Sequence, residues 1–310
     1  MITILQKELA DYFSSIRFIV LFILVLLASA AGLYASFQGI RTANLPEGFV
    51  FLGLFTTSGE AIPSLINLIT LLVPIIGIAL GFDAINSERS GGTLSRILSQ
   101  PVYRDDVING KFLAGIIILS LMMAATILIV FGYGMRLIGV TPTSEEALRL
   151  FFYFIFTVIY GAFWMGLAML FSVIFRRIAT SLLTSISVWL FLSIFILLIA
   201  PAIANNLAPI AEGATTAELI RNVGLEQTIM RLSPNTLFSE ATNALLLPAL
   251  GENPLIIAIS PAAAFLLPNP LSLDQSLLFI WPQLTAMIAL SVICFATSYM
   301  VFMRQEIRAT

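Results

Sequence analysis

The sequence has no histidine, a single cysteine (Cys294) and only two lysines, Lys7 and Lys111, among its 310 residues. Zinc sites built from Cys and His ligands, haem sites with a histidine ligand, and disulfides within the chain are therefore excluded. Charged residues make up only 10% of the chain, against about 25% in an ordinary soluble domain. With 59% hydrophobic residues and a mean hydropathy of +1.02, this composition predicts an integral membrane protein. The net charge of -2 gives no reason to expect nucleic-acid binding.

Six uncharged windows are each long enough to cross a bilayer core as a helix, which takes roughly 20 residues. They cover residues 18–37, 61–82, 112–135, 150–175, 178–200 and 282–303. We expect Pro201 to end the fifth helix and Pro282 to lie in the first turn of the sixth. Only Arg176 and Arg177 separate the fourth window from the fifth, which predicts a tight hairpin. The sequence therefore predicts an all-α integral membrane protein with a single transmembrane domain over residues 1–310.

The distribution of lysine and arginine between these windows predicts the orientation. One side carries ten of them: Lys7, Arg17, Arg89, Arg96, Arg104, Lys111, Arg176, Arg177, Arg304 and Arg308. The other side carries five: Arg41, Arg136, Arg149, Arg221 and Arg231. Because positive charges accumulate in cytoplasmic loops, we expect a multi-pass protein of the cell membrane with both termini in the cytoplasm.

Residues 201–281 are then expected to form a long extracytoplasmic loop. Thr215 and Glu218 form a capping-box pattern, which predicts a helix that runs to about Arg231. We expect Ser233-Pro234 to end that helix, and a second short helix over 239–247. The stretch 253–273 is uncharged, but four prolines interrupt it: Pro254, Pro261, Pro268 and Pro270. Since prolines disrupt a helix interior, we expect re-entrant or membrane-surface segments there rather than a seventh span.

Residues 1–16 have the pattern of an amphipathic helix. Its apolar face is predicted to hold Ile2, Leu5, Leu9, Tyr12, Phe13 and Ile16. Its polar face is predicted to hold Thr3, Gln6, Lys7, Glu8, Asp11 and Ser14. Such a helix lies along a membrane surface, either as a simple anchor or as a platform for a cytoplasmic partner.

The segment 83–111, between the second and third windows, is the most polar part of the chain. Eight of its 29 residues are charged, and it is far longer than the roughly 4–6 residues that a connection needs. Gly91 and Gly92 allow a turn, and residues 93–99 can form a short helix that ends before Pro101. Asp105 or Asp106 can cap the next helix. The length and charge of this segment predict that it docks another protein.

The order of residues in this segment resembles the signature of the ABC type-2 permeases. The resemblance rests on these residues: Glu88-Arg89, Gly92-Thr93-Leu94, Leu98, Pro101-Val102, Arg104 and Gly110-Lys111. The family includes exporter permeases for polysaccharides and drugs and those of nitrous-oxide-reductase maturation, which this chain resembles in particular. The resemblance implies a coupling helix between the second and third spans that inserts into a separate ATPase. It also implies re-entrant segments in the last outer loop.

The same resemblance implies a set of site residues and partners. The ATPase-coupling residues would be Glu88, Arg89, Gly92, Thr93, Leu94, Leu98, Pro101 and Arg104. The partners would be two copies of an ABC ATPase, a second permease copy (an identical chain or a close homologue) and the lipid bilayer. The sequence has no G-x-x-x-x-G-K-[ST] phosphate loop. We therefore expect a transporter subunit rather than an enzyme, with no cofactor of its own and with ATP and Mg²⁺ bound by the ATPase.

Two other functions compete with this interpretation. An ion-coupled secondary transporter that uses protons commonly needs an ionisable residue at membrane depth, and the six windows contain none. Sodium coupling through backbone carbonyls stays open. A membrane enzyme lacks histidine and an intramembrane aspartate pair, and we expect both lysines on the cytoplasmic side. Some polar residues in the windows either line a substrate path or join helices: Asn67, Thr70, Thr126, Thr157, Ser172, Thr184, Ser185 and Ser187.

Overall fold

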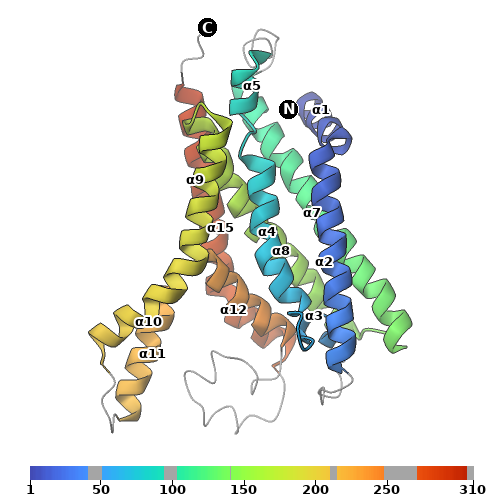
Figure 1. Cartoon of the computed structure of the whole chain (residues 1–310), viewed down its shortest axis with the longest axis vertical. Coiled ribbons are helices and arrows are strands. Elements are labelled where there is room, and N and C mark those ends of the chain that lie inside the picture. The colour runs from blue at the N-terminus through green and yellow to red at the C-terminus, as the bar shows by residue number, and fades with distance from the viewer. Residues whose placement is uncertain (41–50, 94–102, 140, 210–214, 248–270, 306–310) are drawn as a thin grey trace.

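The computed structural model shows a bundle of long helices (Figure 1). It describes residues 1–40, 51–93, 103–139, 141–209, 215–247 and 271–305. No strand occurs among these residues. In chain order, the elements are α1 (Ile2–Ser14), α2 (Ile16–Ile40), α3 (Gly53–Thr56), α4 (Leu65–Gly81), α5 (Asn86–Ser90), α7 (Arg104–Ile138), α8 (Ser144–Ile174), α9 (Ile178–Leu190), the π-helical turn η1 (Phe191–Phe195), α10 (Ile196–Leu207), α11 (Thr216–Met230), α12 (Pro234–Leu246) and α15 (Leu273–Arg304).

Six helical stretches in the described part are long and apolar enough to cross a membrane. They are Ile16–Ile40, Leu65–Ser90, Arg104–Arg136, Ser144–Ile174, Ile178–Leu207 and Leu273–Arg304. Each contains most or all of one predicted window, so the six predicted spans and the all-α membrane fold are confirmed. Several of these helices extend beyond their apolar windows, which brings charged residues into their terminal turns.

Helix α8 lies at the centre of the bundle, because α4 and α15 both pack along it. Glycines bring α4 and α8 into backbone contact. A Cβ atom built on Gly77 would lie 2.7 Å from the carbonyl oxygen of Gly161, and one on Gly81 would lie 2.5 Å from that of Met165. Close approach of this kind is how helices associate in a membrane, where burial of apolar surface provides no driving force.

Aromatic side chains fill the space between α8 and α12. Tyr160 stacks on Phe238 with ring centroids 4.3 Å apart, and Phe156 stacks on the same ring at 5.7 Å. Trp164 is fully buried beside them. Hydroxyl groups of the spans mostly bond within their own helices, as Thr157 does to the carbonyl of Tyr153 at 2.7 Å. These contacts favour helix packing over a substrate path for such residues.

The expectations that Pro201 ends the fifth span and that Pro282 lies in the first turn of the sixth are both wrong. Pro201 lies inside α10 and Pro282 lies inside α15, which begins nine residues earlier at Leu273. A proline removes one backbone hydrogen bond but leaves the rest of the helix intact. In a bilayer the remaining backbone groups must still be satisfied internally, so the helix continues through the proline.

The loop between the last two spans contains two of the helices described here. α11 begins with the predicted capping box, in which Thr215 and Glu218 bond each other's backbone N–H groups. α12 begins at Pro234 rather than at residue 239, because Ser233 is its N-cap residue and a proline is well suited to the first helical turn. Most of the proline-rich stretch 253–273 lies outside the described residues.

Different helices and loops lie at the two ends of the bundle (Figure 1). One end holds α1, α5, the hairpin between α8 and α9, and the last turn of α15. We call it the terminal end. The opposite end, called the distal end, holds α3, α11 and the start of α15. Residues 1–16 and the described part of 83–111 therefore lie at the same end of the molecule.

Candidate functional site

The chain leaves the second span at the terminal end and turns sharply before α5. α4 ends at Gly81, α5 covers Asn86–Ser90, and Gly91 and Gly92 follow. Gly92 has a φ of 66°, a backbone conformation that residues with a side chain rarely adopt. Of the predicted coupling residues, Glu88, Arg89, Gly92, Thr93 and Arg104 are described, whereas Leu94, Leu98 and Pro101 lie outside the described residues.

Two hydroxyl groups hold the turn between α4 and α5. The Ser172 oxygen of α8 accepts hydrogen bonds from the backbone N–H groups of Ile85 (3.0 Å) and Asn86 (3.2 Å). Ser181 of α9 donates to the carbonyl of Phe82 at 2.7 Å. Because these bonds satisfy backbone groups at the end of the second span, α5 starts from a fixed position against α8 and α9.

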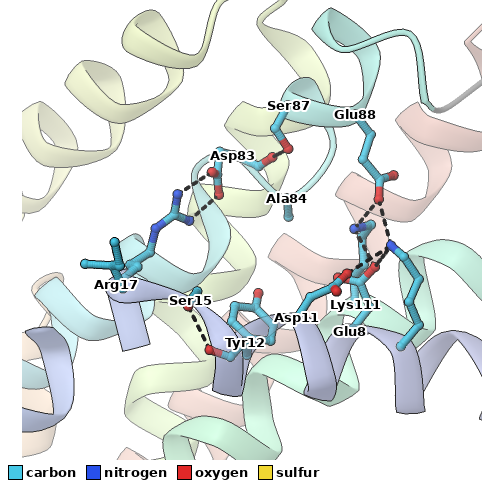
Figure 2. Close-up of a pocket in the computed structure, with 12 residues that line it drawn as sticks. Glu8, Asp11, Tyr12, Ser15, Arg17, Asp83, Ala84, Ser87, Glu88 and Lys111 are labelled. Carbon is cyan, nitrogen blue, oxygen red and sulfur yellow. Dashed lines mark hydrogen bonds and ion pairs between the residues drawn. The ribbon is translucent and has the colours of Figure 1, made fainter. Parts of the chain in front are cut away.

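Glu88 of α5 belongs to an ion cluster that α1 and α7 complete (Figure 2). The Lys111 ammonium lies 2.8 Å from Glu88 Oε1 and 2.9 Å from Glu8 Oε1. Lys7 adds weaker contacts to Glu8 at 3.1 Å and to Glu88 at 3.7 Å. The Lys111 side chain is only 6% exposed, whereas that of Lys7 is 51% exposed. Lys111 is therefore the buried centre of the cluster.

The predicted polar face of residues 1–16 is wrong at Glu8. This residue is buried against α7 together with Ile4. Ile2, Phe13 and Ile16 of the predicted apolar face are exposed at the surface of the chain, where a membrane-surface helix contacts lipid. Glu8 is buried because the ammonium group of Lys111, which comes from a distant part of the chain, offers its carboxylate a partner. α1 therefore packs on the bundle through a mixed face of apolar and charged residues.

The two predicted coupling arginines both contact the end of α15. Arg89 donates to the side-chain oxygen of Gln305, and Arg104 donates to its backbone oxygen at 3.1 Å. The Gln305 amide in turn donates to the carbonyl of Val173 at 2.9 Å. Gln305 was not predicted, since no local pattern points to a residue so far along the chain. It joins both ends of the 83–111 segment to α8 and α15.

The start of the third span differs from the prediction. α7 begins at Arg104 with Tyr103 as its N-cap residue, and no side chain caps it. Asp105 and Asp106 lie in its first turn instead. Their negative charge still favours the helix there, because the N-terminal end of a helix carries partial positive charge.

A pocket of about 440 Å³ lies between α1 and the turn after α4, with the ion cluster along one side (Figure 2). On its other side Arg17 and Asp83 form two hydrogen bonds of 2.8 and 2.7 Å. Burial by itself lowers the pKa of Lys7, but the carboxylates of Glu8, Glu88 and Asp11 outweigh it and raise that pKa. Lys7 therefore stays cationic at neutral pH.

A second polar cluster lies at the distal end around Arg149, which the sequence predicted only as one of the five positive charges on the extracytoplasmic side. Its side chain is fully buried. It donates to Glu145 at 2.7 Å, to the carbonyl of Leu245 at 2.8 Å and to the hydroxyl of Ser276 at 3.1 Å. The cluster joins α8, α12 and α15. Its sequence signal was the spacing of Glu145 and Arg149, which lie one helical turn apart.

Comparison of the sequence with known proteins identifies the family of this chain. The profile of the ABC-2 family transporter proteins matches residues 2–307. A probable ABC transporter permease protein NosY from Pseudomonas aeruginosa is 34% identical over 131 residues, which cover 41% of this chain and 42% of that protein. The protein of the same name from Stutzerimonas stutzeri is 34% identical over 119 residues, which cover 36% of this chain and 42% of that protein. The matched segments thus span less than half of each relative. Because the family match extends over nearly the whole chain, this protein belongs to the ABC-2 transporter family and is a multi-pass membrane subunit of an ABC transporter.

Proposed function

We propose that this chain is the permease subunit of an ABC exporter and that it receives the energy of ATP hydrolysis through the segment 83–111. The observation that carries the proposal is the support around α5. Side chains from α1, α8 and the end of α15 contact the described part of this segment, and Lys111 at its end pairs with Glu88 of α5. A mere connection between two spans does not need such support, whereas a docking element must keep its position when a partner pushes on it.

The terminal end faces the cytoplasm in this proposal. Ten of the fifteen lysines and arginines belong to the N-terminal, 83–111, hairpin and C-terminal segments. The described parts of these four segments gather at one end of the bundle (Figure 1). The positive-inside rule then orients the molecule with α1 and α5 toward the ATPase.

ATP and Mg²⁺ bind to the partner ATPase rather than to this chain. A phosphate loop requires a lysine followed by serine or threonine before a helix. Here Gly110-Lys111 is followed by Phe112, and Lys111 lies inside α7 with its ammonium group held by two carboxylates. The proposal therefore requires an ATPase on a separate chain, in two copies.

A second permease copy, identical or closely related, completes the translocation unit. The fifth span supports this part of the proposal, since only 6% of its apolar window is buried within the chain. Large apolar side chains such as Phe191, Phe195 and Leu198 are more than half exposed. Such a surface faces lipid or another permease chain.

Affinity purification of the tagged chain in mild detergent tests the proposal. We expect an ABC ATPase to co-purify in a one-to-one ratio with permease chains, and we expect ATP hydrolysis only when it is present. A folded permease that is recovered from its native membrane without any ATPase would contradict the proposal. So would ATP hydrolysis by a rigorously pure preparation of this chain alone.

A further inference from the structure

The ammonium group of Lys111 connects three helices that are far apart in sequence. It lies 2.9 Å from Glu8 of α1 and 2.8 Å from Glu88 of α5, while Lys111 itself belongs to α7 (Figure 2). The three side chains are 6%, 10% and 12% exposed. The Oε1 atom of each carboxylate forms an ion pair with this ammonium group. A single buried cation thus bridges two carboxylates that belong to different helices.

α1 is also attached to the bundle by packing and by a hydrogen bond. A Cβ atom built on Gly110 would lie 2.8 Å from Cγ2 of Ile4, so α1 rests directly against the backbone of α7. The Tyr12 hydroxyl donates to the carbonyl of Leu80 at 3.0 Å, at the end of the second span. α1 therefore contacts both helices that flank the 83–111 segment.

Loss of the Lys111 charge would set the two carboxylates against each other. Both Oε1 atoms lie within hydrogen-bond distance of the same ammonium group, so they are close neighbours in a poorly hydrated site. Removal of the buried partner is unfavourable, because it leaves the two carboxylates with the weaker contacts to the exposed Lys7, at 3.1 and 3.7 Å. The repulsion would act between α1 and α5, which are the two elements that the cation joins.

We propose that Lys111 is a positioning residue that fixes α5 to α1 and α7, so that the surface helix and the docking element move as one unit. α1 is then a support of the docking element rather than a simple membrane anchor. One consequence of this inference, that ATPase binding depends on Lys111, rests on the proposed function. The attachment of α1 to α5 can be measured without any partner.

Spin-label distances between α1 and α5 test the attachment in the full chain. Labels at Gln6→Cys and Ser90→Cys, in a Cys294→Ala background, report on two exposed positions. We expect a narrow distance distribution for the parent protein and for Lys111→Arg, and a broader, longer one for Lys111→Met. Arg221→Met is the control, since it removes a cationic side chain at an exposed position of α11, outside the cluster. An unchanged distribution in Lys111→Met would overturn the proposal, as would an equal broadening in Arg221→Met.

Glu8→Gln serves if Lys111→Met does not fold. This variant leaves Lys111 paired with Glu88, so no buried charge loses its last partner, but it removes the ion pair to α1. We expect a broadened α1–α5 distance with a melting temperature close to that of the parent. A distribution as narrow as that of the parent would count against the proposal.

Co-purification of the ATPase tests the consequence. We expect Lys111→Met to bind the ATPase about tenfold or more weakly, Lys111→Arg to restore binding and Arg221→Met to bind as the parent does. Full ATPase binding by a Lys111→Met protein whose α1–α5 distance is broadened would overturn the role in docking. If the parent protein itself retrieves no ATPase, the proposed function fails, and the distance measurement still decides whether Lys111 holds α1 and α5 together.

Discussion

The guanidinium of Arg149 donates a hydrogen bond of 2.8 Å to the backbone oxygen of Leu245, which ties the first turns of α8 to the end of α12. The same side chain bonds Ser276 and the carbonyl of Leu271 near the start of α15. One buried cation therefore fixes three helices at the distal end, much as Lys111 does at the terminal end.

Replacement of Arg149 should destabilise the permease more than any exposed arginine does. Arg149→Met leaves the Leu245 and Leu271 oxygens without their donor, which should cost about 1–3 kcal/mol of unfolding free energy for each oxygen that stays buried. Arg149→Lys should recover only part of this loss, because one ammonium group cannot reproduce the planar fork. Arg221→Met, at an exposed position, is the control. Denaturant unfolding in detergent provides the measurement, and equal stability of the two methionine variants would show that the buried network contributes little.

Close approach of α4 and α8 predicts a sharp difference between two glycines. Gly77→Ala should destabilise the protein by about 1–3 kcal/mol, since the new methyl group has no space between the two backbones. Gly132→Ala in α7 should be neutral or stabilising by up to ~1 kcal/mol, because nothing lies within 4 Å of its Cβ position. Thermal unfolding of the two variants checks this. Similar melting temperatures would mean that α4 and α8 are not in backbone contact.

The number of spans could be predicted from the sequence, whereas the ends of several helices could not. Bilayer thickness sets a minimum length for each apolar window, and six windows met it. The rules that a proline ends a helix or lies in its first turn failed at Pro201 and Pro282, since they derive from helices whose free backbone groups can bond to water.

The sequence also predicted only some residues of the candidate site, because the others take part through contacts between distant parts of the chain. Glu88 and Arg89 belong to a local pattern, so the sequence could single them out. Glu8 and Gln305 take part through contacts that span 103 and 216 positions along the chain. Helical periodicity placed Glu8 on the solvent face because it contains no information about Lys111. The scarcity of lysine, with one of only two at the start of a span, was the signal that a buried acidic partner exists.

The orientation predicts which positions an impermeant thiol reagent reaches. In a Cys294→Ala background, Glu226→Cys should be labelled on intact cells and Arg177→Cys only after permeabilisation. The two residues lie in α11 and in the hairpin before α9, at opposite ends of the bundle (Figure 1). Labelling of position 177 but not of position 226 on intact cells would invert the proposed topology.

Binding of the ATPase to a Leu94→Asp variant tests most directly that 83–111 docks the ATPase. An aspartate at this predicted apolar anchor should leave the permease folded but abolish co-purification of the ATPase, because burial of an unpaired carboxylate in an apolar groove is costly. Leu232→Asp makes the same change at a leucine that is 68% exposed in the turn between α11 and α12 and should retain the ATPase. Loss of the ATPase in Leu94→Asp alone, with equal melting temperatures for both variants, is the predicted result. Normal amounts of ATPase bound to a well-folded Leu94→Asp permease would contradict the account.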